Sequence, residues 1–123
     1  MDAEAFAREM LKTDSAIRYV AVVTNDYHVL VSKQRDGVLP LTSEDMQQNF
    51  ISIVPQIIIE SVDKLSAFLG KVGGVTAHYE KALLLFYRFA NMIVIISFQP
   101  EVATPFYNRI TQAFEKHSTQ YLR

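Results

Sequence analysis

Two apolar runs in the second half of the chain decide the fold: Ala82-Leu83-Leu84-Leu85-Phe86-Tyr87-Arg88-Phe89 and Met92-Ile93-Val94-Ile95-Ile96-Ser97-Phe98-Gln99. Both runs have the length and residue types of β-strands, and Ala90-Asn91 between them forms a turn. Large apolar side chains occupy alternate positions in both phases, so each strand has to be covered on its two faces. We therefore expect central strands of a sheet that carries helices on both sides.

Further strands and helices are predicted on either side of this pair. Residues 17–24 and 27–33 are β-branched and aromatic runs joined by Asn25-Asp26, which favours a hairpin, and residues 75–80 predict a third strand. Helical periodicity covers residues 1–13, the span from Thr42 or Ser43 to Leu69, and the span from Thr104 to the C-terminal residues. The order α-β-β-α-β-β-β-α predicts the α+β class, with a single five-stranded antiparallel sheet. The long second helix is expected on one face and the terminal helices on the other.

Composition limits the classes of protein that need to be considered. The chain has 123 residues, half of them hydrophobic, and we expect one globular domain over residues 1–123. The formal net charge of -1 gives no long-range attraction for nucleic acid. No apolar stretch approaches the ~20 residues that span a bilayer, so no membrane segment is predicted. The acidic opening Met1-Asp2-Ala3-Glu4 differs from a secretory signal, which predicts a cytoplasmic protein.

No constellation of residues predicts catalysis. His28, His78 and His117 lie in different elements and lack metal-ligand spacing, so we predict no metal site. The glycine-rich stretch at residues 70–74 follows a helix and precedes a strand, which is the reverse of a phosphate-binding loop. No nucleophile motif is present, and we predict a protein that is not an enzyme and has no cofactor. Arg88 either marks a strand end or pairs with an acidic group across an interface.

The second helix carries more apolar side chains than one sheet contact needs. A wheel at about 100° per residue assigns one apolar sector to the sheet. That sector contains Met46, Phe50, Ile53, Val54, Ile57 and Phe68. A neighbouring stripe contains Ile51, Ile58, Val62 and Leu69, with Ile59 further round. Exposing this second stripe favours association, because each large side chain that is buried contributes roughly 1.5–3 kcal/mol. We infer a dimer interface.

An alternative reading of the same helix involves Pro55. A proline inside a helix removes one backbone hydrogen bond and clashes with the preceding turn, so a bend or a break is expected there. A bend would rotate the two halves of the helix relative to each other, and one continuous core could then use both stripes. The helical wheel assumes a straight helix and does not separate the two readings.

The element order over nearly the whole chain resembles the roadblock/dynein light chain family. The segments that carry the resemblance are Val20-Ala21-Val22-Val23 before the hairpin, Glu80-Lys81-Ala82-Leu83-Leu84-Leu85, and Met92-Ile93-Val94-Ile95-Ile96. The related profilin and longin folds and PAS-like domains share much of this pattern. Members of the family are scaffolds and regulators of small Ras-like GTPases, usually without chemistry of their own. The resemblance thus implies a non-enzymatic regulatory or scaffold module.

The resemblance also implies how the chain assembles. In the family, the second helix and the third strand of each protomer pair with those of a partner, which joins two sheets into one. Transferred to this sequence, the interface residues are Ile51, Ile58, Ile59, Val62, Thr76, His78 and Glu80. The expected partners are a second copy of the chain, and a small GTPase or another protein.

Two other functions remain open from the sequence. The first is a small-molecule sensor of PAS or profilin-like type, in which Tyr19, Phe86, Tyr87 and Phe98 are candidates for lining a pocket. An apolar cavity beside the sheet would favour it. The second is a hydrolase with an unrecognised site, which broad substrate screening would test.

Overall fold

The computed structural model describes residues 1–100 and 104–123, with side-chain surroundings in the last helix given from residue 108 onward. Its elements confirm the expected order, with a short helical extension after the second helix. They are α1 (Ala3–Thr13), β1 (Ile17–Thr24), β2 (Val29–Gln34), α2 (Glu44–Val62), the 3-10 turn η1 (Asp63–Leu65), α3 (Ser66–Leu69), β3 (Gly74–His78), β4 (Leu83–Phe89), β5 (Met92–Phe98) and α4 (Thr104–Tyr121).

The sheet has five strands in the order β2-β1-β5-β4-β3, and every neighbouring pair is antiparallel. β5 is the middle strand, and all its residues are buried. β4 lies next to it, so both apolar runs occupy internal positions as predicted. The two edges are β2, which contains Lys33, and β3, which contains no Lys, Arg, Asp or Glu.

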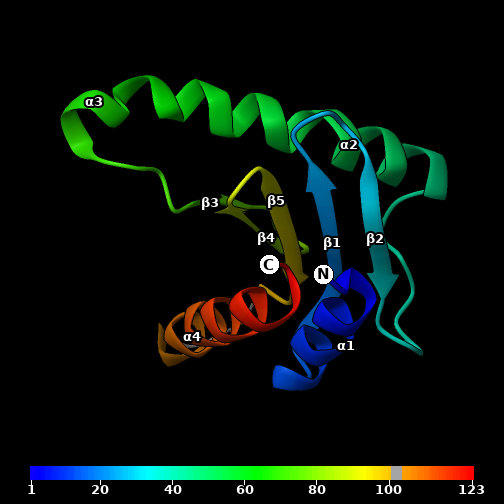
Figure 1. Cartoon of the computed structure of the whole chain (residues 1–123). Helices are drawn as coiled ribbons and strands as arrows, with labels where there is room; N and C mark the ends of the chain where they lie inside the picture. Colours follow the sequence, from blue (N-terminus) through cyan, green and yellow to red (C-terminus); the bar gives the residue numbers. More distant parts are fainter. Residues whose placement is uncertain (101–103) are drawn as a thin grey trace.

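Helices cover both faces of the sheet (Figure 1). α2 lies across one face, where Ile51 and Ile59 pack with side chains of β1, β4 and β5. α1 and α4 lie on the other face, where Phe6, Met10 and Ile110 belong to a second core. The two chain ends meet there, since the Asp2 N–H donates to the Tyr121 carbonyl at 2.7 Å. The expected division between the long helix and the terminal helices is confirmed.

The predicted limits of the second helix are confirmed, and of the bend or break predicted at Pro55 the break is excluded. The Ser43 hydroxyl accepts a hydrogen bond from the Met46 N–H at 3.2 Å, as an N-cap does. Gly70 ends α3 with φ 89°, a conformation that glycine adopts without steric cost. The helix does not break at Pro55, because α2 runs through it to Val62. Pro55 is buried, and Ile51 and Ile59 hold the turns on either side of it against the sheet.

Two strand boundaries differ from the prediction by more than one residue. Tyr27 has φ 70° in the turn of the first hairpin, so β2 begins at Val29 and not at Tyr27. The Tyr79 N–H donates to the Ala82 carbonyl at 2.9 Å and closes the turn after β3. Glu80 therefore lies in this turn and not on the edge strand where it was expected. Ala103, expected on the stripe of the last helix, lies outside the described residues.

Candidate interaction surface

The stripe of α2 that faces the sheet is Ile51, Pro55 and Ile59, and the predicted assignment of the two stripes is wrong. Ile51 is 3% exposed and Ile59 is fully buried, whereas Ile57, assigned to the sheet, is 53% exposed. The three buried residues are spaced four apart, so they form a narrow contact row. Ile51 and Ile59, two of the residues implied at the dimer interface, are thus covered by their own chain.

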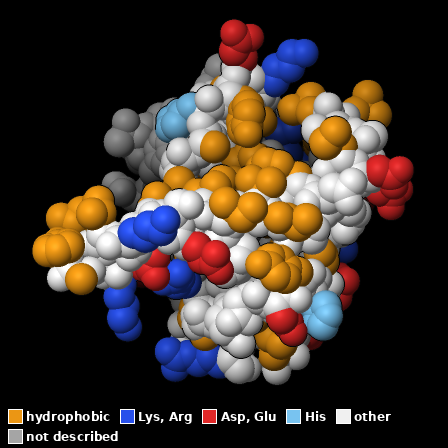
Figure 2. Space-filling view, turned by 90° about the horizontal axis from the view of Figure 1, so that it is seen from above, with side chains coloured by type: hydrophobic (Ala, Val, Ile, Leu, Met, Phe, Trp, Pro, Cys, Tyr) orange, Lys and Arg blue, Asp and Glu red, His pale blue; other side chains and the backbone are white. Residues whose placement is uncertain are grey.

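An apolar face of α2 nevertheless remains uncovered in the single chain. Met46, Ile53 and Ile57 are half or more exposed, and Val62 is 40% exposed. Phe50, Val54 and Ile58 are half-buried beside them. Figure 2 shows these side chains as orange atoms over the middle of the face that α2 covers. The surplus of apolar side chains that the sequence predicts is therefore real, although different residues carry it.

The opposite flank of α2 is polar. Asn49, Ser52, Gln56 and Glu60 follow one another at helical spacing, and the Gln56 amide donates to the Glu60 carboxylate at 3.0 Å. At about 100° per residue, Phe50, Val54 and Ile58 lie on the other flank. The helix therefore has one flank suited to water and one suited to an apolar contact.

The helical extension beyond α2 forms an apolar end that projects past the sheet. Figure 1 shows η1 and α3 reaching beyond the edge strand β3. Neither segment contains a buried residue, and Leu65, Phe68 and Leu69 are exposed, Phe68 by 84%. Figure 2 shows the same end as an orange group at the left. We call Leu65, Phe68 and Leu69 the apolar tip.

Arg88 fixes the base of this tip to the sheet. Its guanidinium donates to the Asp63 carboxylate at 3.2 Å, and both side chains are about one-third exposed. Arg88 is also the last residue but one of β4, as the strand-end prediction has it. The ion pair joins the C-terminal end of α2 to the end of β4 that pairs with Gly74 and Val75 of β3.

No strand within residues 1–100 and 104–123 pairs with the outer side of β3, so the backbone groups on that side are available to a further strand. The residues on either side of the strand bond in the direction of β4. The Tyr79 N–H donates to the carbonyl of Ala82, just before β4, at 2.9 Å, and the Gly73 carbonyl accepts from the Arg88 N–H at 3.1 Å. Hydrogen-bonding direction alternates along an antiparallel strand, so the groups that point away from β4 belong to Gly74, Thr76 and His78. An edge without charges or proline is a ready template for another strand.

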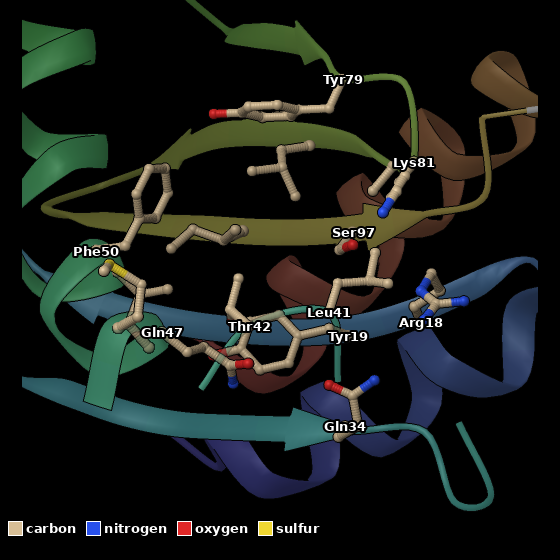
Figure 3. Close-up of a pocket in the computed structure, with 15 residues that line it drawn as sticks. Arg18, Tyr19, Gln34, Leu41, Thr42, Gln47, Phe50, Tyr79, Lys81 and Ser97 are labelled. Carbon is tan, nitrogen blue, oxygen red and sulfur yellow. The ribbon is translucent and has the colours of Figure 1, made fainter. Parts of the chain in front are cut away.

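A cavity of about 320 Å³ lies between the N-terminal half of α2 and the end of the sheet where β3 stops (Figure 3). Its wall is mainly apolar. The apolar side chains include Tyr19, Leu41, Met46, Phe50, Tyr79 and Leu84. Arg18, Gln34, Lys81 and Ser97 supply polar groups. The Tyr19 hydroxyl lies 2.5 Å from the Ser32 hydroxyl, and burial raises the pKa of Tyr19 above 10.0, so the phenol is neutral.

Three of the four predicted pocket residues lie elsewhere. Phe86 is buried in the core under α2, and Phe98 is buried in the core on the opposite face. Tyr87 stacks on Phe114 with ring centroids 4.3 Å apart and shares a 3.0 Å hydrogen bond with Thr111. Only Tyr19 lines the cavity. The prediction for Phe86, Tyr87 and Phe98 depends on their aromatic character. Aromatic residues occur both in cores and in cavity walls, so this property does not distinguish the two positions.

The histidines lie far apart in the sequence and in the fold. His28 lies in the hairpin turn, with its Nδ1 3.5 Å from an Asp26 carboxylate oxygen, and His78 is exposed on β3. His117 is half-buried on α4. Among residues 1–100 and 104–123, no group of three or more His, Cys, Asp or Glu side chains could hold a metal ion. No described helix has both the length and the apolar character needed to cross a bilayer.

Comparison with solved structures shows which fold this arrangement is. A roadblock/LC7 domain from Streptomyces avermitilis superposes with a TM-score of 0.74 at 9% identity, over 99% of this chain and 98% of that one. The chain has the roadblock fold. The gliding protein MglB from Thermus thermophilus gives a TM-score of 0.71 at 13% identity, over 94% of this chain and 82% of that one. The resemblance seen in the sequence is thus confirmed at the level of the fold.

The roadblock fold is related to that of profilin, as the sequence also suggested. Profilin IB from Acanthamoeba castellanii superposes with a TM-score of 0.54 at 8% identity, over 95% of this chain and 94% of that one. No protein-family model matches the sequence, and no curated protein is similar to it in sequence.

The row of α2 that faces the sheet could have been recognised in the sequence if Pro55 had been counted as an apolar residue. Pro55 is predicted only to bend or break the helix, although its ring is apolar and packs in the core like other buried side chains. Counting it with Ile51 and Ile59 gives the row that faces the sheet. The cavity had no such signal, because Leu41, Tyr79 and Lys81 come from separate loops that only the fold brings together.

Proposed function

We propose that the chain is a non-enzymatic dimerising module that serves as a scaffold or regulator, with a small Ras-like GTPase as its candidate protein partner. The observation that carries the proposal is the uncovered apolar face of α2 beside the unpaired edge of β3. The two features adjoin, so one partner molecule could cover both. The roadblock fold supports the proposal, because the resemblance implies dimers built from the same helix and strand.

In the proposed dimer, β3 of one copy pairs with β3 of the other, and the two α2 helices lie side by side. Thr76 and His78 contribute through their outward backbone groups, while Ile58 and Val62 contribute apolar contact. Ile53 and Ile57 replace Ile51 and Ile59 as the large aliphatic residues available for contact. One solved MglB structure is described as having a tetrameric arrangement, so a roadblock fold can assemble beyond a single chain.

Blocking the edge strand tests the strand half of this interface. Thr76→Pro removes an outward N–H that pairing needs, and an edge strand tolerates proline when that N–H faces solvent. We expect the variant to be folded by circular dichroism and to associate less than the unmodified chain in light scattering. The control is Lys33→Thr on β2, the other edge strand, and this variant should associate as the unmodified chain does. Equal association of all three proteins would remove the strand half of the interface.

The GTPase role needs its own measurement. The protein should bind at least one small Ras-like GTPase of its source organism, with an affinity that differs between the GDP-bound and GTP-bound forms. Biolayer interferometry with each purified GTPase in both nucleotide states measures this difference. If the protein binds none of these GTPases, a small GTPase is excluded as its partner. The dimer measurements would still decide the scaffold role.

A second function is favoured by the cavity. An apolar cavity beside the sheet is the feature expected of a small-molecule sensor, and about 320 Å³ is at the lower end of ligand pockets. The polar groups of Arg18 and Lys81 at its wall would suit a small ligand with an anionic end. A thermal-shift screen with metabolites, followed by native mass spectrometry of the purified protein, tests this function. A ligand retained at one copy per chain would support it.

A further inference from the structure

The apolar tip and the cavity lie at opposite ends of the same sheet edge. Asp63, at the base of the tip, pairs with Arg88 near the end of β4 that faces Gly74. Tyr79 and Leu84, in the cavity wall, lie at the other end, where β3 stops and β4 begins. In the close-up of the cavity, Tyr79 follows the end of β3 on one side, and Phe50 and Gln47 from the N-terminal half of α2 lie on the other (Figure 3). Within one chain, the tip and the cavity therefore do not meet.

Antiparallel pairing of two β3 edges brings these two features together. A two-fold axis between the strands places the Gly74 end of one copy beside the His78 end of the other. The tip projects beyond the β3 edge of its own sheet (Figure 1), and its base lies near the Gly74 end of that strand, so in the dimer it reaches over the His78 end of the partner strand. The cavity opens at that end. Because the axis is two-fold, the dimer contains two such contacts, and each copy provides the tip for one and the cavity for the other.

We propose that the apolar tip of each copy fills the cavity of a second copy, with Phe68 as the central side chain. This inference rests on the proposed dimer and names the occupant of the cavity within it. Phe68 is the most exposed large apolar side chain among the described residues, and the cavity is an apolar hollow on the same face of the sheet. Burying Phe68 among Leu41, Met46 and Phe50 removes both apolar surfaces from water at once.

Size and charge agree with this occupant. A cavity of about 320 Å³ has room for an aromatic ring and part of a neighbouring leucine, but not for a longer segment. The last turn of α3 contains no basic residue, so its carbonyl groups have no cation of their own chain in that turn. Cations stabilise the C-terminal end of a helix, and Lys81 of the receiving copy stands at the cavity wall. The flank of α2 that borders the cavity is also the apolar one.

Cysteine cross-linking tests the contact directly, because the chain contains no cysteine. Ala67→Cys, which keeps Phe68 beside it, and Tyr79→Cys are made as separate proteins of different mass, mixed, and treated with a short bis-maleimide. Both positions are exposed, as is Tyr27, which lies in the hairpin turn at the opposite end of the sheet and gives the control Tyr27→Cys. These substitutions leave the buried core unchanged, so all three proteins should fold.

We expect the Ala67→Cys and Tyr79→Cys pair to form the mixed covalent dimer on the order of 100-fold faster than the Ala67→Cys and Tyr27→Cys pair at micromolar protein. Two groups held together in an assembly have effective concentrations in the millimolar range. Phe68→Ala should also weaken self-association by about tenfold or more, while Tyr27→Ala should not.

The other outcomes separate this inference from the proposed function. If light scattering gives a dimer but the two cross-linking rates are equal, the tip does not enter the partner's cavity, and the dimer itself stands. If native mass spectrometry finds a small molecule in the cavity of that dimer, the tip is not the occupant. If the protein is a monomer at every accessible concentration, both proposals fail.

Discussion

Arg35 shows how one side chain organises a segment that looked irregular in the sequence. Residues 34–41 contain Gly37 and Pro40 and have no hydrophobic period, which is typical of a surface loop, and nothing in the sequence assigns a role to Arg35. In the structure, the Arg35 guanidinium donates to the carbonyls of Leu11, Ile17 and Asp14, the last two at 2.6 and 2.7 Å. These carbonyls lie at the end of α1 and the start of β1. Arg35 thus joins the loop after β2 to the turn that leads into the sheet.

Replacing Arg35 by lysine is expected to destabilise the fold, although the charge is kept. An ammonium group cannot reproduce the planar fork that serves several carbonyls at once. Hydrogen bonds from a charged group contribute about 1.5–3 kcal/mol each, and we expect Arg35→Lys to lower the free energy of unfolding by about 1–3 kcal/mol. Urea denaturation measures it, and Arg8→Lys on the exposed side of α1 is the control. Equal midpoints for the two variants would contradict the role of Arg35.

His117 should make stability depend on pH in a defined direction. Burial, aided by the charge of Lys116, lowers the pKa of His117 below 6.5, and Glu9 on α1 opposes the shift. As the pH falls through 6.5, the unfolded chain therefore binds the proton first, and stability decreases until the folded-state pKa is passed. Above 6.5 this contribution to stability is fully present.

The imidazole resonances of His117 in NMR titration should give a midpoint below 6.5. Urea denaturation of His117→Asn should show a weaker loss of stability between about pH 7.5 and pH 5 than the unmodified chain. The same resonances in urea-unfolded protein provide the reference midpoint. A folded-state midpoint at or above that reference would contradict the burial of His117.

At the scale of elements, the sequence predicts most of the sheet because its strands are apolar in both phases. Residues 83–89 and 92–98 are apolar on both faces of the strand, so both faces of the sheet have to be covered. This requirement predicts helices on each side of the sheet. The faces of α2 were not predictable in the same way. Its apolar arc is so wide that periodicity leaves two adjacent stripes equally suited to the sheet, and the buried row depends on Pro55 being counted as apolar.

Removing the side chain of Ile59 tests which stripe faces the sheet. Ile59 is fully buried, so Ile59→Ala should cost about 2–5 kcal/mol, including the cavity that is left behind. Ile53→Ala on the same helix, where the side chain is half exposed, should cost under about 1 kcal/mol. Chemical denaturation at low protein concentration measures both. A larger cost at Ile53 would restore the stripe assignment that the wheel favoured.

A charge at Ile57 tests the outward face of α2. Ile57→Glu keeps the fold of the single chain, because the side chain is exposed there, but it places a carboxylate in the proposed contact. We expect self-association to weaken by about 100-fold or more, since an unpaired buried charge costs several kcal/mol. Asn49→Glu, on the polar flank, introduces the same group and should leave association unchanged. Sedimentation velocity over a concentration series distinguishes them, and equal behaviour would contradict the interface.

At the scale of the whole molecule, the uncovered features share one side of the fold. The outward face of α2, the β3 edge, the apolar tip and the cavity all lie on the side of the sheet that carries α2, while the terminal helices close the other face (Figure 1). The sequence predicts the surplus of apolar side chains on α2, but it does not predict where the apolar tip and the cavity lie. The tip and the cavity are built from segments whose positions depend on the complete fold, and no local pattern marks them.

The mass of the purified protein in solution tests the central claim most directly. Light scattering coupled to size-exclusion chromatography, at tens of micromolar protein, should give about twice the 14.0 kDa of the single chain. The mass should fall toward the single-chain value on dilution or with Ile57→Glu. A mass of one chain at every concentration, with the fold intact by circular dichroism, would contradict the account.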